Sequence, residues 1–257
     1  MLDTMKYVVK EPDIYNNKKI AEIQDWFSKN KMKTAVINIS GGADSTYVAY
    51  LLVKALGKEN VIGLLQPNGE QKDIKDALEV VKNLQIKYYI LNISEAYDAL
   101  VTSFKDFVSR LTSEDYDNFK GECDFENATI NLAPRLRMAN AYMIANEVNG
   151  VVVGTGNASE RYIGFFTKWG DSACDYNPIK NLLKTDLIEA GLVLGIPEHL
   201  IKKTPADGLS GKTDEEKFGF SYKVLDGYIR TGVCEDYKIK EKIDKMHENS
   251  RHKFEEI

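Results

Sequence analysis

The chain has 257 residues, of which 43% are hydrophobic and 28% charged, and its net charge is −5 at pH 7. This is the composition of a globular protein, and the acidic balance argues against nucleic acid as the main partner. No stretch approaches the roughly 20 apolar residues of a membrane helix, and the first residues lack the apolar core of a secretory signal. We therefore expect a cytoplasmic protein that binds neither nucleic acid nor membrane.

Two apolar patterns alternate along the chain. Short β-rich runs are separated by longer segments in which apolar residues recur at helical spacing. The first β-rich run ends in Gly41-Gly42, and a helical pattern follows at once. The expected strands are 34–40, 61–66, 87–93 and 150–156, and the expected helices before and between the first three are 14–30, 44–56 and 71–85.

Strands that alternate with helices predict right-handed βαβ units and a buried parallel sheet. Ligands of such sheets bind beyond the carboxyl ends of the strands. Two of the expected strands end in glycine-bearing turns, Ser40-Gly41-Gly42 and Gly154-Thr155-Gly156. We expect both turns to open on the same rim of the sheet and the functional site to lie there.

The segment 95–149 has a helical pattern and is too long for a simple crossover between strands. We expect it either to pack as a helical subdomain or to pair with another subunit. Pro134 predicts a helix start or a kink near its position. The charged segment 238–257 is expected to form a surface helix. One apolar face of the long segment comprises Ala99, Leu100, Phe104, Phe107 and Val108.

The loop at 40–45, with the sequence SGGADS, combines the features of an anion site. Its glycines let backbone N–H groups curl around an oxyanion, and the next helix adds the partial positive charge of its N-terminus. Ser40, Ser45 and Thr46 carry hydroxyls that can donate to the same phosphates. The lysine of a Walker loop is missing, and Asp44 would repel a phosphate unless a cation such as Mg²⁺ lies between them. The alternative is that Asp44 only caps the helix.

This loop resembles the pyrophosphate-binding loop of the adenylating ATP pyrophosphatases, whose fold is a parallel-sheet sandwich. The second half of the chain narrows the resemblance. The stretches 125–138, 151–197 and 205–232 resemble, in order, motifs of the ammonia-dependent NAD synthetase family, and the similarity runs from about residue 15 to the C-terminus. It implies one domain over 1–257, an α/β/α sandwich of the adenine-nucleotide α-hydrolase kind.

The resemblance also implies a site. Asp44 and Glu160 match the family's Mg²⁺-binding carboxylates, and Lys184 matches a lysine that reaches the ATP phosphates. Asp171 would orient ammonium, and it completes the expected catalytic set with Asp44 and Lys184. The expected ATP-binding residues are Ser40, Gly41, Gly42, Asp44, Ser45, Thr46, Arg137, Thr155 and Lys184. The expected deamido-NAD-binding residues are Lys168, Asp171, Phe165, Phe166, His252 and Lys253.

The implied reaction is the ATP-dependent amidation of deamido-NAD by ammonia through an adenylated nicotinate, which yields NAD, AMP and pyrophosphate. Glutamine-dependent relatives carry an added glutaminase domain, for which 257 residues leave no room, so we expect free ammonia or a separate partner that supplies it. The family also implies a homodimer with 95–149 at its interface and a mobile lid over about 203–216. Phe254 replaces the arginine that usually follows the family's His-Lys pair near the C-terminus.

Two alternatives remain open from the sequence. The loop is shared with other ATP pyrophosphatases, such as tRNA-modifying adenylating enzymes, although these would be expected to show a basic surface. The chain could also be a nucleotide-binding regulator without activity. Retention of Asp44, Glu160 and Lys184 argues against a regulator, because binding alone does not need all three residues.

Overall fold

The computed structural model describes residues 11–70, 74–112, 114–115, 129–205 and 213–254. Within these residues the strands are β1 (Thr34–Asn38), β2 (Val61–Leu65), β3 (Lys87–Ile90) and β4 (Gly150–Val153). The longer helices are α1 (Pro12–Lys29), α2 (Ala43–Leu56), α3 (Ile74–Leu84), α4 (Ser94–Ser109), α7 (Leu132–Glu147), α9 (Lys184–Val193), α12 (Tyr222–Thr231) and α13 (Tyr237–Asn249). The short helices are α8 (Ala158–Ile163), α10 (Glu198–Ile201), α11 (Asp214–Phe218), η2 (Lys58–Asn60) and η3 (Arg251–Lys253).

The strands form one sheet in the order β3-β2-β1-β4, and every pairing is parallel, as predicted. Val36 of β1 lies opposite Ile62 of β2 on one side and Val152 of β4 on the other. The chain runs outward from β1 to β3 and then returns to place β4 on the far side of β1. Strand order therefore reverses between β1 and β4, and ligands of open parallel sheets bind at such a switch point.

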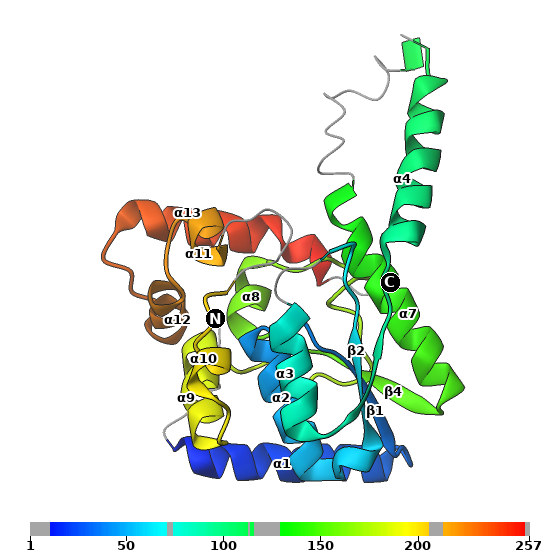
Figure 1. The fold of residues 1–257 in the computed structure, drawn as a ribbon. Coiled ribbons are helices and arrows are strands. Elements are labelled where there is room, and N and C mark those ends of the chain that lie inside the picture. The colour runs from blue at the N-terminus through cyan, green and yellow to red at the C-terminus, as the bar shows by residue number, and fades with distance from the viewer. Residues whose placement is uncertain (1–10, 71–73, 113, 116–128, 206–212, 255–257) are drawn as a thin grey trace.

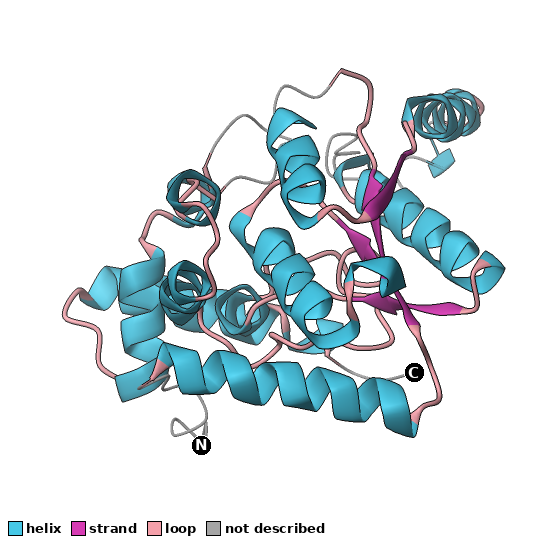
Figure 2. Ribbon diagram, turned by 60° about the horizontal axis from the view of Figure 1, so that its bottom comes forward, coloured by secondary structure: helices cyan, strands magenta, loops and turns pink. Residues whose placement is uncertain are grey.

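Helices cover both faces of the sheet, which gives the predicted α/β/α sandwich (Figure 2). Successive strand residues point to opposite faces. Ala35 and Ile37 pack with residues of α1, α2, α3 and α9, whereas Val36 packs against Ala141 and Ala145 of α7. Strand residues buried on both faces are what a parallel sheet between two helical layers requires.

A second, smaller core lies beside the sheet, where α11, α12 and α13 gather at the upper left of Figure 1. Its buried centre includes Phe218, Leu225, Ile229 and Ile243, and residues of α8 pack against them. Because α8 follows β4 closely in the chain, this core holds the end of β4 against the C-terminal helices. α13 is the predicted surface helix, with Ile243 as its buried residue.

The edge strand β3 contradicts the prediction of a sheet buried throughout. All four of its residues are exposed, including the large side chains of Tyr88, Tyr89 and Ile90. The reason is that α4 extends beyond the body of the described chain (Figure 1) and has no buried residue. Residues 116–128 of the long helical segment lie outside the described part, and Pro134 lies in the first turn of α7, as predicted.

Among the described residues, none of the helices combines the length and apolar character needed to cross a membrane.

Candidate active site

Gly41 and Gly42 turn the chain from β1 into α2. Gly41 has a φ of 80°, and a Cβ there would lie 2.7 Å from the backbone nitrogen of Ala77 in α3, so only glycine fits this contact. The Oγ atoms of Ser40 and Ser45 are 3.2 Å apart, and Gly42 N donates to Ser40 Oγ at 3.2 Å. These are long hydrogen bonds, and the loop can exchange them for stronger ones to a phosphate.

Gly41→Ala is expected to lower the free energy of unfolding by about 1–3 kcal/mol, as overpacking does, and to weaken ATP binding. The added methyl group would push the loop away from α3. Gly69→Ala is the matched control, because Gly69 also has a positive φ (76°) but nothing lies within 4 Å of a Cβ placed there. Denaturant unfolding and ATP titration measure the difference, and equal losses in both variants would show that backbone strain alone is responsible.

Asp44 lies in the first turn of α2, and the fold brings groups from the end of β4 and the start of α9 to it. Its carboxylate accepts hydrogen bonds from Lys184 Nζ and, at 2.8 Å, from Asn157 Nδ2. Lys184 is 2% exposed, and its Nζ also lies 4.0 Å from Glu160 Oε1. Asn157 caps α8, because its side chain accepts from Glu160 N at 2.9 Å. The predicted residues Asp44, Glu160 and Lys184 therefore meet at the switch point.

Burial determines the electrostatics of this group. Loss of water and the neighbouring charge of Asp44 raise the pKa of Glu160 to about 8, although Lys184 opposes this shift. Burial alone would lower the pKa of Lys184, but the carboxylates of Asp44 and Glu160 outweigh it and raise that pKa above its usual value. Two carboxylates thus share one ammonium group, and a further cation would stabilise them both.

Two residues from α11 and α12 contact this group and were not predicted as site residues. Tyr222 Oη donates to Asp214 Oδ2 at 3.1 Å and lies 3.4 Å from Glu160 Oε1. Lys184 Nζ lies 5.5 Å from the centre of the Tyr222 ring, within cation–π range. Asp214 is buried at the start of α11. The acidic run TDEE at 213–216 was the available signal, but only the fold brings Asp214 to this group.

The donor set fits a divalent cation. Mg²⁺ is usually held by one or two carboxylates together with substrate phosphates, and Asp44 and Glu160 both lie within reach of Lys184 Nζ. Asp44 belongs to the glycine loop, so a cation on its carboxylate would face a phosphate bound there. Over the described ranges, no group of three or more His, Cys, Asp or Glu side chains is placed to hold a metal. The remaining ligands would come from substrate and water.

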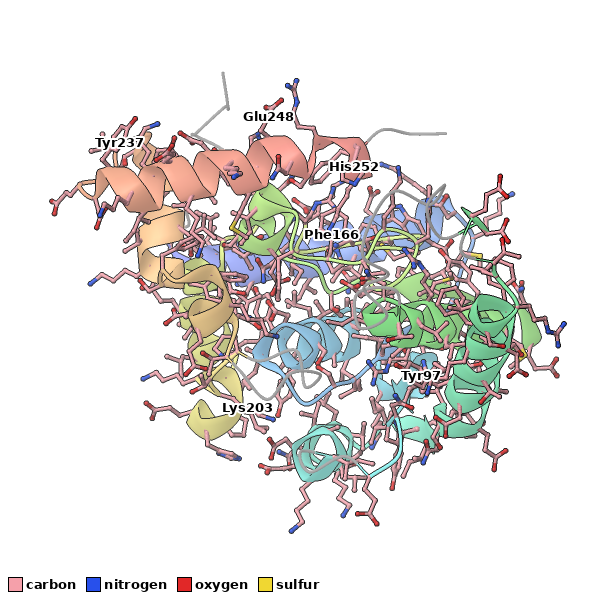
Figure 3. The ribbon with its side chains drawn as sticks, turned by 90° about the horizontal axis from the view of Figure 1, so that it is seen from above. Tyr97, Phe166, Lys203, Tyr237, Glu248 and His252 are labelled. Carbon is pink, nitrogen blue, oxygen red and sulfur yellow. The ribbon has the colours of Figure 1, made fainter. Side chains whose placement is uncertain are left out.

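The predicted deamido-NAD residues gather where the C-terminal turn η3 packs on the loop after α8. Lys168 Nζ donates to the carbonyl of His252 at 2.9 Å. In return, Lys253 Nζ donates to the carbonyls of Gly164 and Phe166 at 2.7 and 2.8 Å. Figure 3 shows His252 at the end of α13, in the same part of the molecule as Phe166. The tail and the loop therefore form one unit.

The aromatic residues of this loop have different surroundings. Phe166 packs edge-on against Phe254 with ring centres 5.3 Å apart, so the residue that departs from the family pattern strengthens the contact between tail and loop. Phe165 instead packs on Phe218 of the second core, with ring centres 4.6 Å apart. Asp171 is exposed, and its Oδ1 accepts from a backbone N–H of its own loop at 2.9 Å. Phe165 and Phe166 are both half-buried and Asp171 is exposed, so all three keep some surface for a ligand.

The remaining predicted ATP residues lie along the rim. Thr46 is buried, and its hydroxyl donates to a carbonyl at the start of α2 at 2.8 Å. Arg137 Nε donates to the carbonyl of Gln66 at 2.8 Å, which holds it at the end of β2. Arg135 diverges from it and donates to a carbonyl of the loop after α8 at 3.3 Å. Thr155 follows β4. The contacts of Thr46, Arg137 and Thr155 with ATP stay predictions.

An anion-binding turn and a pair of carboxylates at the switch point of a parallel sheet make this an α/β nucleotide-binding protein. A family model described as NAD synthase matches residues 15–257. The NH(3)-dependent NAD(+) synthetase of Pyrococcus furiosus is 36% identical over 250 residues, which cover 92% of this chain and 91% of that protein. The chain therefore belongs to the NAD synthase family, a family of ATP-using ligases.

Solved structures agree with this assignment. The structure of NMN synthetase from Francisella tularensis has a TM-score of 0.85 and 33% identity to this chain, and covers 97% of this chain and 98% of that one. The NH3-dependent NAD synthetase from Campylobacter jejuni, solved in complex with nitrate, has a TM-score of 0.74 and 26% identity, with the same coverage of both chains. The similarity therefore extends over nearly the whole length of each protein.

Proposed function

We propose that this protein is an ammonia-dependent NAD synthetase that amidates deamido-NAD with the use of ATP and Mg²⁺. The observation that carries the proposal is the meeting of Asp44, Glu160 and Lys184 beside the anion-binding loop. Binding a nucleotide does not require a buried lysine between two carboxylates. Transfer of an adenylyl group does require preorganised charge of this kind, because negative charge shifts among the phosphates during the reaction.

The reaction has two steps. In the first, a carboxylate oxygen of the nicotinate attacks the α-phosphorus of ATP, the bond from that phosphorus to the bridging oxygen breaks, and pyrophosphate leaves. In the second, ammonia attacks the carboxyl carbon and loses a proton, and the C–O bond to AMP breaks. The product is the amide of NAD. No side-chain nucleophile takes part, because AMP is already a good leaving group.

The groups of the protein bring two anions together and neutralise them. Backbone N–H groups and hydroxyls of the loop at 40–45 hold the pyrophosphate portion of ATP. Lys184 supplies the positive charge that this loop lacks. Mg²⁺, held by Asp44 and Glu160, would act as a Lewis acid on the phosphate oxygens. Asp171 accepts hydrogen bonds from ammonium and orients it toward the nicotinate.

Turnover by the purified protein tests the proposal. Incubation with ATP, Mg²⁺, ammonium and deamido-NAD should form equal amounts of NAD, AMP and pyrophosphate, which chromatography can follow. Glutamine in place of ammonium should give no NAD unless a separate partner supplies ammonia. ATP binding without any amide product would overturn the proposal and favour a regulator, whereas adenylation of a tRNA base would favour the tRNA-modifying alternative.

Nicotinate mononucleotide is a second candidate acceptor, because the Francisella tularensis protein of similar structure is an NMN synthetase. It carries the same nicotinate carboxylate as deamido-NAD and lacks the adenylate half. The values of kcat/KM for the two acceptors, measured side by side, decide between them. A preference for the mononucleotide would keep the adenylation chemistry and change the product to NMN.

We propose further that the protein is a homodimer whose interface includes β3, α4 and α7. Leu100 and Phe107 of α4 and Met143 of α7 are exposed, Phe107 by 51% and Met143 by 60%. α4 packs against α7, and the exposed strand β3 leads directly into α4 (Figure 1). Exposed apolar surface of this kind marks an interaction site. A second copy of the chain would cover it.

Phe107→Glu is expected to shift the protein to a monomer, because each copy would have to bury an unpaired charge in the apolar contact. Val233→Glu is the control, since Val233 is 69% exposed in the turn between α12 and α13, on the other side of the molecule. Size-exclusion chromatography with light scattering measures the mass of each variant. A monomeric wild type would contradict the dimer, and a dimeric Phe107→Glu variant would place the interface elsewhere.

A further inference from the structure

The helix that presents Lys184 has no cap of its own. The first N–H groups of a helix need acceptors from outside the helix, and the residue before α9 is Leu183, whose side chain cannot accept. The acceptors come from two other helices. Lys184 N donates to Ser159 Oγ of α8 at 2.9 Å, and Thr185 N donates to Asp226 Oδ2 of α12 at 2.8 Å.

Asp226 also holds the other acceptor, Ser159, in place. Its Oδ1 accepts a hydrogen bond from the hydroxyl of Ser159, so Asp226 and Ser159 together cap α9. Asp226 is 0% exposed, and a buried carboxylate is a costly group that a serine or asparagine at position 183 could have replaced as a cap. A local cap would satisfy the N–H groups of α9 but would not connect α9 to α8.

The connection joins the two sides of the candidate active site. Ser159 directly precedes Glu160, and its hydroxyl oxygen accepts the hydrogen bond from the backbone N–H of Lys184. The side chains of these two residues, Glu160 and Lys184, also meet, because Lys184 Nζ lies 4.0 Å from Glu160 Oε1. Misplacement of a catalytic group by about 1 Å can cost about 100-fold in rate, so a device that sets the spacing of these residues acts on the reaction.

We propose that Asp226 is a positioning residue, which acts through Ser159 to set the distance between Glu160 and Lys184. It touches neither substrate nor reacting atoms. The proposal rests on the proposed function for its effect on turnover, but its structural part concerns the start of α9 alone. Asp226 therefore acts by fixing the positions of its neighbours. Its charge is stabilised by two hydrogen bonds and by the N-terminus of α9.

Three variants test it. Asp226→Asn keeps the shape of the side chain and removes its charge, and Ser159→Ala removes the acceptor of Lys184 N while leaving Asp226 on Thr185. Tyr228→Phe is the matched control, because Tyr228 Oη of α12 donates to Asp244 Oδ1 of α13 at 2.6 Å, away from the start of α9. All three variants remove a contact of α8 or α12, but only the first two disturb the cap.

We expect Asp226→Asn and Ser159→Ala to lower kcat about 10- to 100-fold, the usual effect of losing a group that orients a ligand residue. They should also raise the Mg²⁺ concentration for half-maximal rate and leave the KM for deamido-NAD unchanged. Hydrogen exchange of a peptide spanning 182–187 should become faster in both. Tyr228→Phe should lower the melting temperature without changing kcat or the Mg²⁺ requirement.

Two results would overturn the proposal: unchanged kcat with faster exchange at 182–187, or a loss of kcat in Tyr228→Phe as large as in the cap variants. A wild-type protein that amidates neither acceptor would instead refute the proposed function. In that case, calorimetric titration of the wild type and the variants with Mg²⁺ and ATP tests whether the cap positions Glu160 and Lys184. Weaker binding in the two cap variants alone would uphold it, and equal binding in all variants would reject it.

Discussion

Asp44→Asn is expected to reduce kcat about 100- to 1000-fold, the range found when one preorganised charged contact is removed from a catalytic site. The Asp44 carboxylate accepts from both Lys184 and Asn157, and asparagine has the same shape without the charge. An uncharged amide cannot hold Mg²⁺ beside the phosphates. Steady-state release of pyrophosphate, measured over a range of Mg²⁺ concentrations, gives the size of the loss.

Stability should change much less than activity in this variant. Breaking an isolated buried ion pair costs about 3–5 kcal/mol, but Lys184 Nζ keeps Glu160 at 4.0 Å as a partner. Asp25→Asn is the control, because Asp25 forms a surface ion pair with Lys29 at 2.7 Å that contributes about 0–1 kcal/mol. Wild-type turnover of Asp44→Asn at saturating Mg²⁺ would show that the Asp44 carboxylate, which makes no cap hydrogen bond to α2, holds no metal in the reaction either.

Lys184→Met is expected to lower kcat about 100- to 1000-fold and, at the same time, to make the stability of the protein depend on Mg²⁺. Methionine has a similar length but no charge, so Asp44 and Glu160 would face each other without a cation. The metal-free variant should therefore melt at a lower temperature than the wild type. Because Lys184 no longer competes for the carboxylates, added Mg²⁺ should bind more tightly and raise the melting temperature.

Opposite changes in metal affinity and turnover distinguish this result from simple damage to the fold. Thermal unfolding with and without Mg²⁺, together with turnover at saturating Mg²⁺, measures both quantities. Lys180→Met is the matched control, since Lys180 is exposed four residues earlier in the same segment. A Lys184→Met variant that melts at the same temperature with and without Mg²⁺ would contradict a shared cation position between Asp44 and Glu160.

Local patterns in the sequence were sufficient for most of the fold. The alternation of β-rich runs and helical spacing predicted β1, β2 and β4 and the helices between them, because each element carries its own apolar period. The same patterns also predicted β3 as a strand but failed for its burial. Its run KYYILNI reads as a buried strand, but burial depends on the helix that follows, and α4 leaves the sheet instead of covering it.

Parts of the site were predictable because they are local in the chain. The sequence SGGADS predicts an anion-binding loop wherever it follows a strand, and Gly41 has the positive φ that this role requires. Asn157, Tyr222 and Asp226 carried no such signal, and the acidic run around Asp214 did not indicate where that residue would lie. Each acts through a partner on another element: Asn157 donates to a residue 113 positions away.

The sequence by itself therefore determined the parallel α/β class and the glycine loop that carries Asp44, since these follow from short-range spacing and backbone geometry. Glu160 and Lys184 were expected from the family resemblance. Only the tertiary structure decided that Lys184 meets Asp44 across 140 positions of chain and that Asp226 caps α9. The physical reason is the return of the chain from β3 to β4, which places the ends of β1 and β4 side by side. Charges that are unrelated in the sequence become neighbours there, with the lysine buried and both carboxylates half-buried.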